Sequence, residues 1–344
     1  MTNSLGGPPR QDGAQLPQVE VVEVGTRAST VAVPRLGTVI AVDEYELLTR
    51  SVGLLDRSER GKLLVTGGEA AEFLQGQVTN DVEGLAPGRG LYAALLNHKG
   101  KLRADMRVLR GEDWLWLDTE TAGLAPVRHT CEVYSLGRDV SHEDVTESRA
   151  ILSLIGPEAR AALGADLPQD ESSFAEGEHG LYVTTDLGVD VICPVADAEA
   201  VAAALGVERV SEDAAECLRV ESGRPRLGFD MGGDTIPQEA GLNERAVNFE
   251  KGCYVGQETV ARLHWRGKPN RHLRGLQLSA PAEHGEPLTV GEREVGKVGT
   301  ACVSPVLGPV ALAIVRREAA LGDTVAVGTH GTTAELTELP FTRP

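Results

Sequence analysis

The sequence of 344 residues has little of what marks several protein classes. Its five cysteines form no C-x-x-C pair and its eight histidines no H-x-x-x-H or H-E-x-x-H spacing, so neither a disulfide framework nor a metal site is expected. No stretch reaches the roughly 18 consecutive apolar residues of a membrane span, and residues 1–18 lack the apolar core of a secretory signal. We therefore expect a cytoplasmic protein with reduced thiols and no membrane contact.

Basic residues are scarce relative to acidic ones. The 33 Lys and Arg against 51 Asp and Glu give a net charge of −18, which argues against nonspecific coating of nucleic acid. No direct DNA binding is expected, and any anionic partner has to meet a local basic patch. With 41% hydrophobic residues, the chain can fill two or three domains of roughly 100–200 residues each.

Two segments share a strand–turn–helix pattern. The apolar runs 62–66 and 151–155 each lead into a glycine turn and then into apolar residues at helical spacing. The matching positions are Gly67 with Gly156, Glu69 with Glu158, Ala70 with Ala159 and Leu74 with Leu163. The match predicts two related α+β units, although two unrelated strand-to-helix turns can also agree over so short a stretch.

Alternating apolar residues separated by turn residues predict hairpins at 91–109 and 181–195. In the first hairpin one face is expected to carry Leu102, Ala104, Met106 and Val108. Ser211 is expected to cap a helix that runs through Val220, and a long loop rich in Gly and Pro follows. From about residue 273, short apolar runs between Gly and Pro predict a small β-barrel.

These patterns predict the organisation of the chain. We expect a disordered tail at 1–38, a first domain at 39–148 and 211–272, an α+β domain at 149–210 and a C-terminal barrel at 273–344.

The segment K-G-C-Y-V-G-Q-E-T-V-A-R at 251–262 carries the clearest chemical signal. Cys253 follows Lys251 and precedes a predicted helix start at 256–257, an arrangement that favours the thiolate. Glu258 and Arg262 have the spacing of an i,i+4 ion pair. Spacing alone leaves open that Cys253 is only a small packed residue.

The same segment resembles the K-G-C-Y/F-x-G-Q-E-x-x-x-R signature of the YgfZ family at every fixed position. The run F-L-Q-G-Q-V-T-N-D-V at 73–82 resembles the F-L-Q-x-x-x-T-N-D-V run that YgfZ proteins share with the glycine-cleavage aminomethyltransferases, the GcvT family. P-Q-E-A-G-L at 237–242 and P-F at 340–341 are similar to further runs of this superfamily, so the resemblance covers about 39–341.

The resemblance implies an α+β fold, a three-domain GcvT/YgfZ-like ring of two related α+β units and a C-terminal β-barrel. It also implies a central opening that accepts tetrahydrofolate or a one-carbon derivative of it. Glu221 and Glu239 match glutamates that contact the folate in GcvT relatives, and one carboxylate can accept two adjacent N–H groups of a pterin. Further candidate folate contacts are Gln257, Tyr92 and Asn97, and the candidate catalytic group is Cys253 with Lys251 and Arg262.

One departure from the GcvT pattern bears on activity. Those transferases carry G-G-x-x-D-D-L with a catalytic first aspartate, and the matching run here is G-K-L-R-A-D-M at 100–106. Ala104 then stands at the catalytic position, and an alanine cannot move a proton. Asp105 should point to the opposite face unless a bulge shifts the register.

The resemblance therefore favours a tetrahydrofolate-binding protein that supports iron–sulfur cluster assembly or repair and, through cluster enzymes, tRNA modification. Reduced folate and iron–sulfur client proteins are the expected partners, and whether the protein is an enzyme stays open. The alternative is a folate-dependent aminomethyltransferase or one-carbon demethylase. A third option is a scaffold in which folate only stabilises the fold and Cys253 is inert.

A basic run follows the signature. Residues 262–274 hold five Arg or Lys, two His and no acid, together with Trp265. The run could face the glutamate tail of folate, an acidic partner or RNA, or it could be a charged linker.

Overall fold

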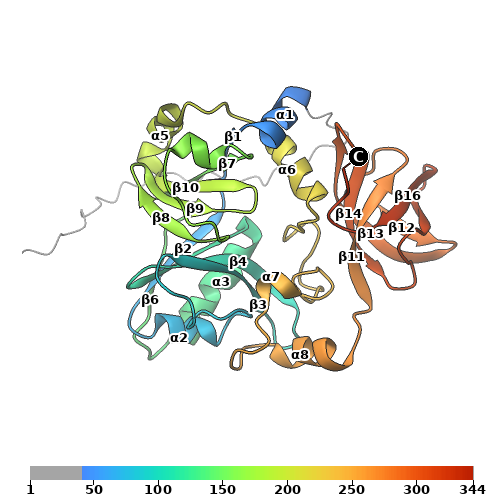
Figure 1. Cartoon of the computed structure of the whole chain (residues 1–344). Coiled ribbons are helices and arrows are strands. Elements are labelled where there is room, and N and C mark those ends of the chain that lie inside the picture. The colour runs from blue at the N-terminus through green and yellow to red at the C-terminus, as the bar shows by residue number, and fades with distance from the viewer. Residues whose placement is uncertain (1–40, 344) are drawn as a thin grey trace, which may run out of the picture. The chain divides into compact units, whose positions relative to one another are not determined.

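The computed structural model describes residues 41–343, so the tail predicted at 1–38 lies outside the described residues. The described chain forms two five-stranded sheets and a closed barrel, connected through helices and loops (Figure 1). The helical elements are α1 (Val42–Arg50), α2 (Ala70–Gln75), α3 (Thr121–Tyr134), α4 (Ala159–Leu163), η1 (Val195–Asp197), α5 (Ala198–Leu205), α6 (Glu212–Glu221), α7 (Asn243–Ala246) and α8 (Gln257–Arg266).

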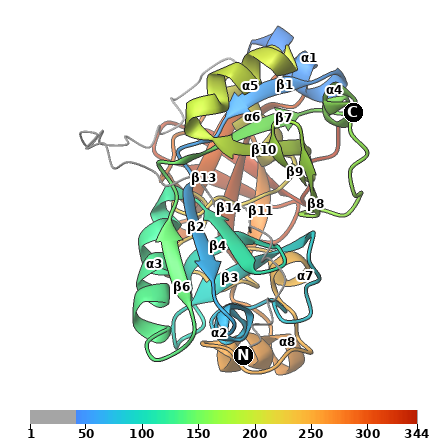
Figure 2. The ribbon, with the colours of Figure 1, turned by 90° about the vertical axis from the view of Figure 1, so that its left-hand side faces the viewer.

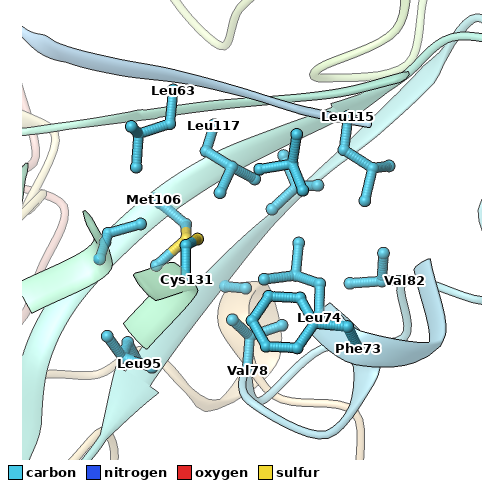
Figure 3. Close-up of a cluster of buried hydrophobic side chains, with 14 of the residues drawn as sticks. Leu63, Phe73, Leu74, Val78, Val82, Leu95, Met106, Leu115, Leu117 and Cys131 are labelled. Atoms are coloured by element: carbon cyan, nitrogen blue, oxygen red, sulfur yellow. The ribbon is translucent and has the colours of Figure 1, made fainter. Parts of the chain in front are cut away.

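The first sheet has the order β3-β4-β5-β2-β6 with antiparallel neighbours. Its strands are β2 (Gly61–Thr66), β3 (Arg89–Leu96), β4 (Leu102–Arg110), β5 (Trp114–Thr119) and β6 (Ser141–Asp144). Helix α3 lies along one face of this sheet (Figure 2). Figure 3 shows the core between them, where Met106 and Leu117 of the sheet face Phe73 and Leu74 of α2 and Cys131 of α3. Burial of this apolar face is what holds the helices on the sheet.

The second sheet has the order β1-β7-β10-β9-β8. Its strands are β1 (Gly53–Asp56), β7 (Arg149–Ile155), β8 (Phe174–Gly177), β9 (Gly180–Thr184) and β10 (Gly188–Pro194). Strand β1 precedes the whole first sheet in the chain, yet it pairs with β7, with Gly53 opposite Ile155. Residues 53–56 therefore belong to the second sheet, and the predicted domain limits themselves stay a prediction.

The two predicted strand–turn–helix units are built alike. Gly67 and Gly156 both have positive φ, at 113° and 131°, where a residue with a Cβ would be strained. A Cβ on Gly67 would lie 2.2 Å from the carbonyl oxygen of Asp139, and one on Gly156 would lie 2.4 Å from that of Ser51. These same two carbonyls accept the main-chain N–H groups two residues after each glycine, at 3.1 and 3.0 Å. The relation between the two α+β units is thus confirmed at atomic level.

The alternation predicted for β4 is wrong at its first residue. Leu95 pairs with Ala104 but Leu96 pairs with Leu102, so Arg103 is an extra residue in a β-bulge. Ala104 stays on the face that packs against α2 and α3, whereas Leu102 turns to the opposite face.

The segment after α6 covers that opposite face. Ser211 caps α6 as predicted, because its hydroxyl accepts the N–H of Ala214 at 3.3 Å. Apolar residues of the loop and helices that follow pack against the bulged hairpin; they include Leu227, Met231, Ala240, Leu242, Ala246 and Val260. The first sheet is therefore buried on both faces near the turn of the β3–β4 hairpin.

The C-terminal residues form the predicted barrel, which closes in the order β11-β14-β13-β12-β15-β16. Its strands are β11 (Arg271–Leu278), β12 (Pro287–Val290), β13 (Arg293–Ser304), β14 (Gly308–Arg316), β15 (Thr324–Val327) and β16 (Thr332–Thr337). The α+β class with two related units and a C-terminal barrel is confirmed. Within residues 41–343 there is no helix with the length and apolarity needed to span a membrane.

Candidate functional site

Lys251 fastens the K-G-C-Y-V-G-Q-E segment to the loop after α2. Its ammonium donates hydrogen bonds to the main-chain oxygens of Gln75, Val78 and Asn80 at 2.6, 2.7 and 2.9 Å. It also lies 5.2 Å from the centre of the Tyr254 ring. Burial lowers the pKa of this lysine to about 8. Because these carbonyls use all the donors of an ammonium group, none is left for a neighbouring thiol.

Cys253 is exposed on the turn that leads into α8. Gly256 caps this helix with a φ of 84°, and a Cβ on it would lie 2.5 Å from the main-chain oxygen of Asn97. Likewise, a Cβ on Gly100 would meet the side chain of Thr259 at 2.8 Å. Glycines at these positions let the Cys253 turn sit directly on the β3–β4 hairpin. The predicted helix start at 256–257 is confirmed.

Asp105 and Tyr92 form a buried acidic pair on the face covered by the 227–260 segment. The Tyr92 hydroxyl donates to Oδ2 of Asp105, while Oδ1 has no hydrogen-bond partner among residues 41–343. Burial raises the pKa of Asp105 to about 6, although the hydrogen bond from Tyr92 acts in the opposite direction. Burial also raises the pKa of Tyr92 well above its ordinary value. The pair therefore offers a carboxyl group that titrates close to neutral pH.

Ala104 lies in the core behind this face. It is fully buried, and a Cβ on Gly123 of α3 would come within 3.2 Å of its methyl group. The methyl group therefore does not stand where an inward carboxylate was expected. Asp105 alternates to the face opposite Ala104, as predicted, and the bulge at Arg103 brings Leu102 to that same face. Nothing in the alternation of residues 102–108 marks this bulge.

Two further buried oxygens on the covering segment have no partner in the described part of the chain. They are Oε1 of Gln238 and Oδ1 of Asn243. The amide nitrogen of Gln238 donates to the main-chain oxygen of Val260 in α8 at 2.7 Å, which fixes the side chain. Helix α7 starts at Asn243 and lies against β3 (Figure 1). The elements around Asp105 thus present acceptor oxygens, which suit a ligand rich in N–H donors.

Glu221 ends α6 and is 3% exposed. Both of its oxygens accept from the Tyr45 hydroxyl at 3.0 Å. Oε2 also accepts from Nε and Nη2 of Arg343 at 3.1 and 2.8 Å. A guanidinium presents the same adjacent N–H donors as a pterin edge, so a pterin reaches this carboxylate only by displacing Arg343.

Glu239 is held in a bidentate ion pair. Nε and Nη2 of Arg271 donate to its two oxygens at 3.0 and 2.7 Å, and the N–H of Ile236 donates to Oε2 at 3.2 Å. Arg271 is the first residue of β11, and its Nη1 also donates to Asp234 at 2.7 Å. The glutamate therefore ties the 234–239 loop to the barrel.

The remaining predicted residues lie around the hairpin. Asn97 shapes the hairpin turn, because its Oδ1 accepts the main-chain N–H groups of Lys99 and Lys101 at 2.8 and 3.1 Å. Gln257 is the first residue of α8. Arg262 is exposed one turn later, and the ion pair predicted between it and Glu258 is not formed among the described residues.

The structure thus brings Tyr92, Asn97, Cys253 and Gln257 to the hairpin and the turn packed on it, whereas Glu221 and Glu239 contact arginines of the tail and the barrel. The roles assigned to all of them stay predictions. In residues 41–343 no three His, Cys, Asp or Glu side chains come together in a way that could hold a metal ion.

Comparisons with known proteins cover most of the chain. Residues 35–189 match the model of the GCVT N-terminal domain, and residues 271–342 match that of the glycine cleavage T-protein C-terminal barrel domain. An aminomethyltransferase of Rubrobacter xylanophilus is 30% identical over 324 residues, which cover 87% of this chain and 86% of that protein.

A protein of Colwellia psychrerythraea named as the tRNA-modifying protein YgfZ is 28% identical over 262 residues, covering 71% of this chain and 77% of that protein. Among solved structures, the glycine cleavage system aminomethyltransferase T of Bartonella henselae superposes with a TM-score of 0.80 at 25% identity. That superposition covers 87% of this chain and 89% of the other.

Proposed function

The chain belongs to the glycine cleavage T-protein family, and on that premise we propose that it is a tetrahydrofolate-binding protein of the YgfZ type that supports iron–sulfur cluster assembly or repair. Reduced folate and iron–sulfur client proteins are its partners in this proposal. The effect on tRNA modification is indirect, through enzymes that carry clusters.

The observation that carries the folate part of the proposal is the unpartnered Oδ1 of Asp105. A buried carboxylate oxygen without a donor is costly, and a ligand that supplies an N–H group removes that cost. A reduced pterin carries several N–H donors, and Gln238 and Asn243 of the covering segment each have a further buried oxygen without a partner among residues 41–343. Tyr92 orients the carboxyl group by its hydrogen bond. The folate, when bound, would carry or accept a one-carbon unit.

The cluster part of the proposal is supported by Cys253. It is exposed, it lies in the K-G-C-Y-V-G-Q-E segment, and its turn packs on the hairpin that carries Tyr92 and Asp105. Lys251 and Gly256 hold this turn from both sides, through the carbonyl contacts of the lysine and the close approach of the glycine to Asn97. An accessible thiolate is the form in which a cysteine binds iron or attacks an electrophile.

The folate part is tested by calorimetry with tetrahydrofolate under reducing conditions. Asp105→Asn should weaken binding at least about tenfold, because the charge-assisted hydrogen bond is lost. Asp113→Asn, on the exposed β4–β5 turn, is the matched control and should bind as the wild type does. Glu239→Ala should also weaken binding if Arg271 releases that carboxylate to the ligand. Absence of tetrahydrofolate binding by the wild type sinks the proposal.

The cluster part is tested separately in a strain that lacks the gene. Wild-type protein should restore the activity of a cluster-dependent enzyme, while Cys253→Ala and Cys253→Ser should not, with all three proteins present in equal amounts. Equal rescue by the variants would leave a folate-binding scaffold in which the thiol is inert.

A second candidate function is one-carbon transfer of the aminomethyltransferase kind, and Asp105 is the observation that favours it. The sequence argument against transfer rested on Ala104. The next residue, Asp105, has a buried carboxyl group with a raised pKa on the opposite face of β4, beside Tyr92. Incubation with an aminomethylated carrier protein and tetrahydrofolate separates the two functions. Release of ammonia that persists in Cys253→Ala but disappears in Asp105→Asn would favour the transferase.

A further inference from the structure

A hollow lies on the side of the β3–β4 hairpin away from Asp105, where β3 and β4 meet α3. Its volume is about 300 Å³, at the low end for ligand pockets, and Leu95, Leu96 and Val255 form its apolar wall. Its polar wall includes Asn97 and Thr130, which are hydrogen-bonded within the chain, and five further side chains: Gln77, His98, Arg103, His129 and Tyr134. These side chains come from the loop after α2, the hairpin and α3.

None of these five further side chains has a hydrogen-bond or ion-pair partner in the described chain, 41–343. For Arg103 this is unusual here, because it is half-buried and the other arginines of the first sheet, Arg89, Arg107 and Arg110, are all bonded. A partly desolvated guanidinium without an acceptor is unfavourable, so an acceptor from outside the chain stabilises it.

The backbone conformation at Arg103 places its side chain in the lining of this hollow. It is the extra residue of the bulge in β4, and bulges commonly redirect a side chain next to a functional site. The turn before it is held by Asn97, and the same turn carries Lys99 and Lys101, which have no ion-pair partner among residues 41–343. The bulge therefore has two effects: it moves Leu102 to the face that carries Asp105, and it leaves Arg103 to share a cavity with α3 on the other face.

We propose that this hollow binds a small multiply charged anion of the phosphate or carboxylate type. Its lining offers guanidinium, amide, phenol and imidazole donors and no carboxylate, in a chain of net charge −18. Donors without competing acids select an acceptor-rich ligand, and the guanidinium can bind phosphate or carboxylate oxygens in pairs. The volume admits one small molecule. Val255 is two residues after Cys253, so the bound anion contacts the turn that carries the thiol.

The experiment is calorimetric titration of the full-length protein with pyrophosphate and with citrate at low ionic strength. Wild-type protein should bind at least one of the two, and the choice between them tells a phosphate-type from a carboxylate-type ligand. Arg103→Gln should weaken binding about tenfold or more. Arg128→Gln is the control. It removes one positive charge from α3, at the residue before His129, and Arg128 forms exposed ion pairs outside the hollow. This variant should bind the anion as the wild type does.

Binding of neither anion by the wild type would overturn the proposal, and so would equal weakening in Arg103→Gln and Arg128→Gln. If Arg103→Gln is poorly folded by circular dichroism, His129→Gln gives the same comparison, because its side chain is exposed on α3 and holds nothing in the core. Chemical shifts of the His98 and His129 rings should move on titration in the wild type. If the chemical shifts of both rings stay unchanged while heat is released, the anion binds elsewhere and the proposed site is wrong.

Discussion

Asp105 shows how the packing of its two neighbours in a strand sets the face on which one residue lies. Its neighbours Ala104 and Met106 are fully packed against α2 and α3, so the carboxyl group must leave the strand on the other face. There the Tyr92 hydroxyl supplies one hydrogen bond and no second donor is present in the described part of the chain. The carboxyl group is therefore held in its costly ionised form only above its raised pKa of about 6.

This predicts that Asp105→Asn changes stability in a way that depends on pH. The folded state raises the pKa of this carboxyl from 3.8 to about 6, so the folded protein binds the proton more tightly than the unfolded chain does. Its contribution to stability is complete below pH 3.8 and is lost as the pH rises through 6, a loss of about 3 kcal/mol. Asparagine cannot ionise, so the variant should gain about 2 kcal/mol over the wild type between pH 4.5 and pH 8.

Urea unfolding at these two pH values measures the effect. Asp113→Asn, at an exposed turn, is the control and should show a much smaller change between the two pH values. A difference between wild type and Asp105→Asn that is the same at both pH values would show that this carboxyl is not held by burial.

At the scale of elements, hydrophobic period located several strands and helices, but it gave no prediction for α1, α3, β5 or β6. Residues 62–66 and 151–155 could be predicted because a buried strand ending in glycine is a strong local signal, and Ser211 because capping is local too. The pairing of β1 with β7 could not be predicted, since nothing local to residues 53–56 names a partner about a hundred residues away. The bulge at Arg103 could not be predicted for the same reason, because packing on both faces of the hairpin sets it.

The candidate site follows the same division. The turn with Cys253 could be found from its motif, whereas the internal arginine partners of Glu221 and Glu239 could not, since Arg343 and Arg271 lie far along the chain. Alternation placed Asp105 opposite Ala104 correctly but put Leu102 on the wrong face, because alternation has no way to register the inserted Arg103.

Helix α6 and strand β13 meet at two cysteines, which predicts a cross-link. The Sγ atoms of Cys217 and Cys302 lie 3.2 Å apart, although the residues are separated by 85 positions. A hydrogen bond with Cys302, together with burial, raises the pKa of Cys217, so the half-buried Cys302 is the better attacking thiol. With diamide as oxidant, the two thiols should pass two hydrogens to the azo group and form one disulfide. The closed loop should stabilise the protein by about 2–4 kcal/mol.

The measurement is peptide mass spectrometry without reduction, in a Cys253→Ser background that removes the exposed thiol. Cys302→Ser is the control and should show neither the linked peptide nor the rise in unfolding temperature. If diamide leaves both cysteines free for alkylation after denaturation, the two elements do not approach as the structure indicates.

At the scale of the whole described chain, one group of buried charges connects α6 to the barrel. Arg219 donates to Glu216 and to Asp230 at 2.8 Å, and to the hydroxyl of Thr300 in β13 at 2.6 Å. Asp230 in turn accepts the main-chain N–H of Thr300 at 2.6 Å. Arg219 is thus paired in the interior. Lys99, Lys101 and Arg103, which have no ion-pair partner among residues 41–343, lie together at the β3–β4 hairpin. This acidic chain thus uses some of its basic residues to hold elements together and leaves others, among them those at the hairpin, without an ion-pair partner in residues 41–343.

Replacement of Arg219 by methionine should therefore loosen the contact between α6 and the barrel. The change leaves Glu216 and Asp230 buried without their main counter-charge, and removal of one partner from such a network typically costs about 3–5 kcal/mol. Arg293→Met removes a guanidinium from an exposed pair with Glu318 and should cost less than about 1 kcal/mol. Chemical unfolding should be followed in a Trp265→Phe background, where the tryptophan fluorescence comes from Trp114 and Trp116 of the first sheet, and by exchange of barrel amides. It should give one transition with Arg219 present and two in Arg219→Met. Equal losses in the two variants, or a single shared transition in Arg219→Met, would mean that apolar packing alone holds α6 on the barrel.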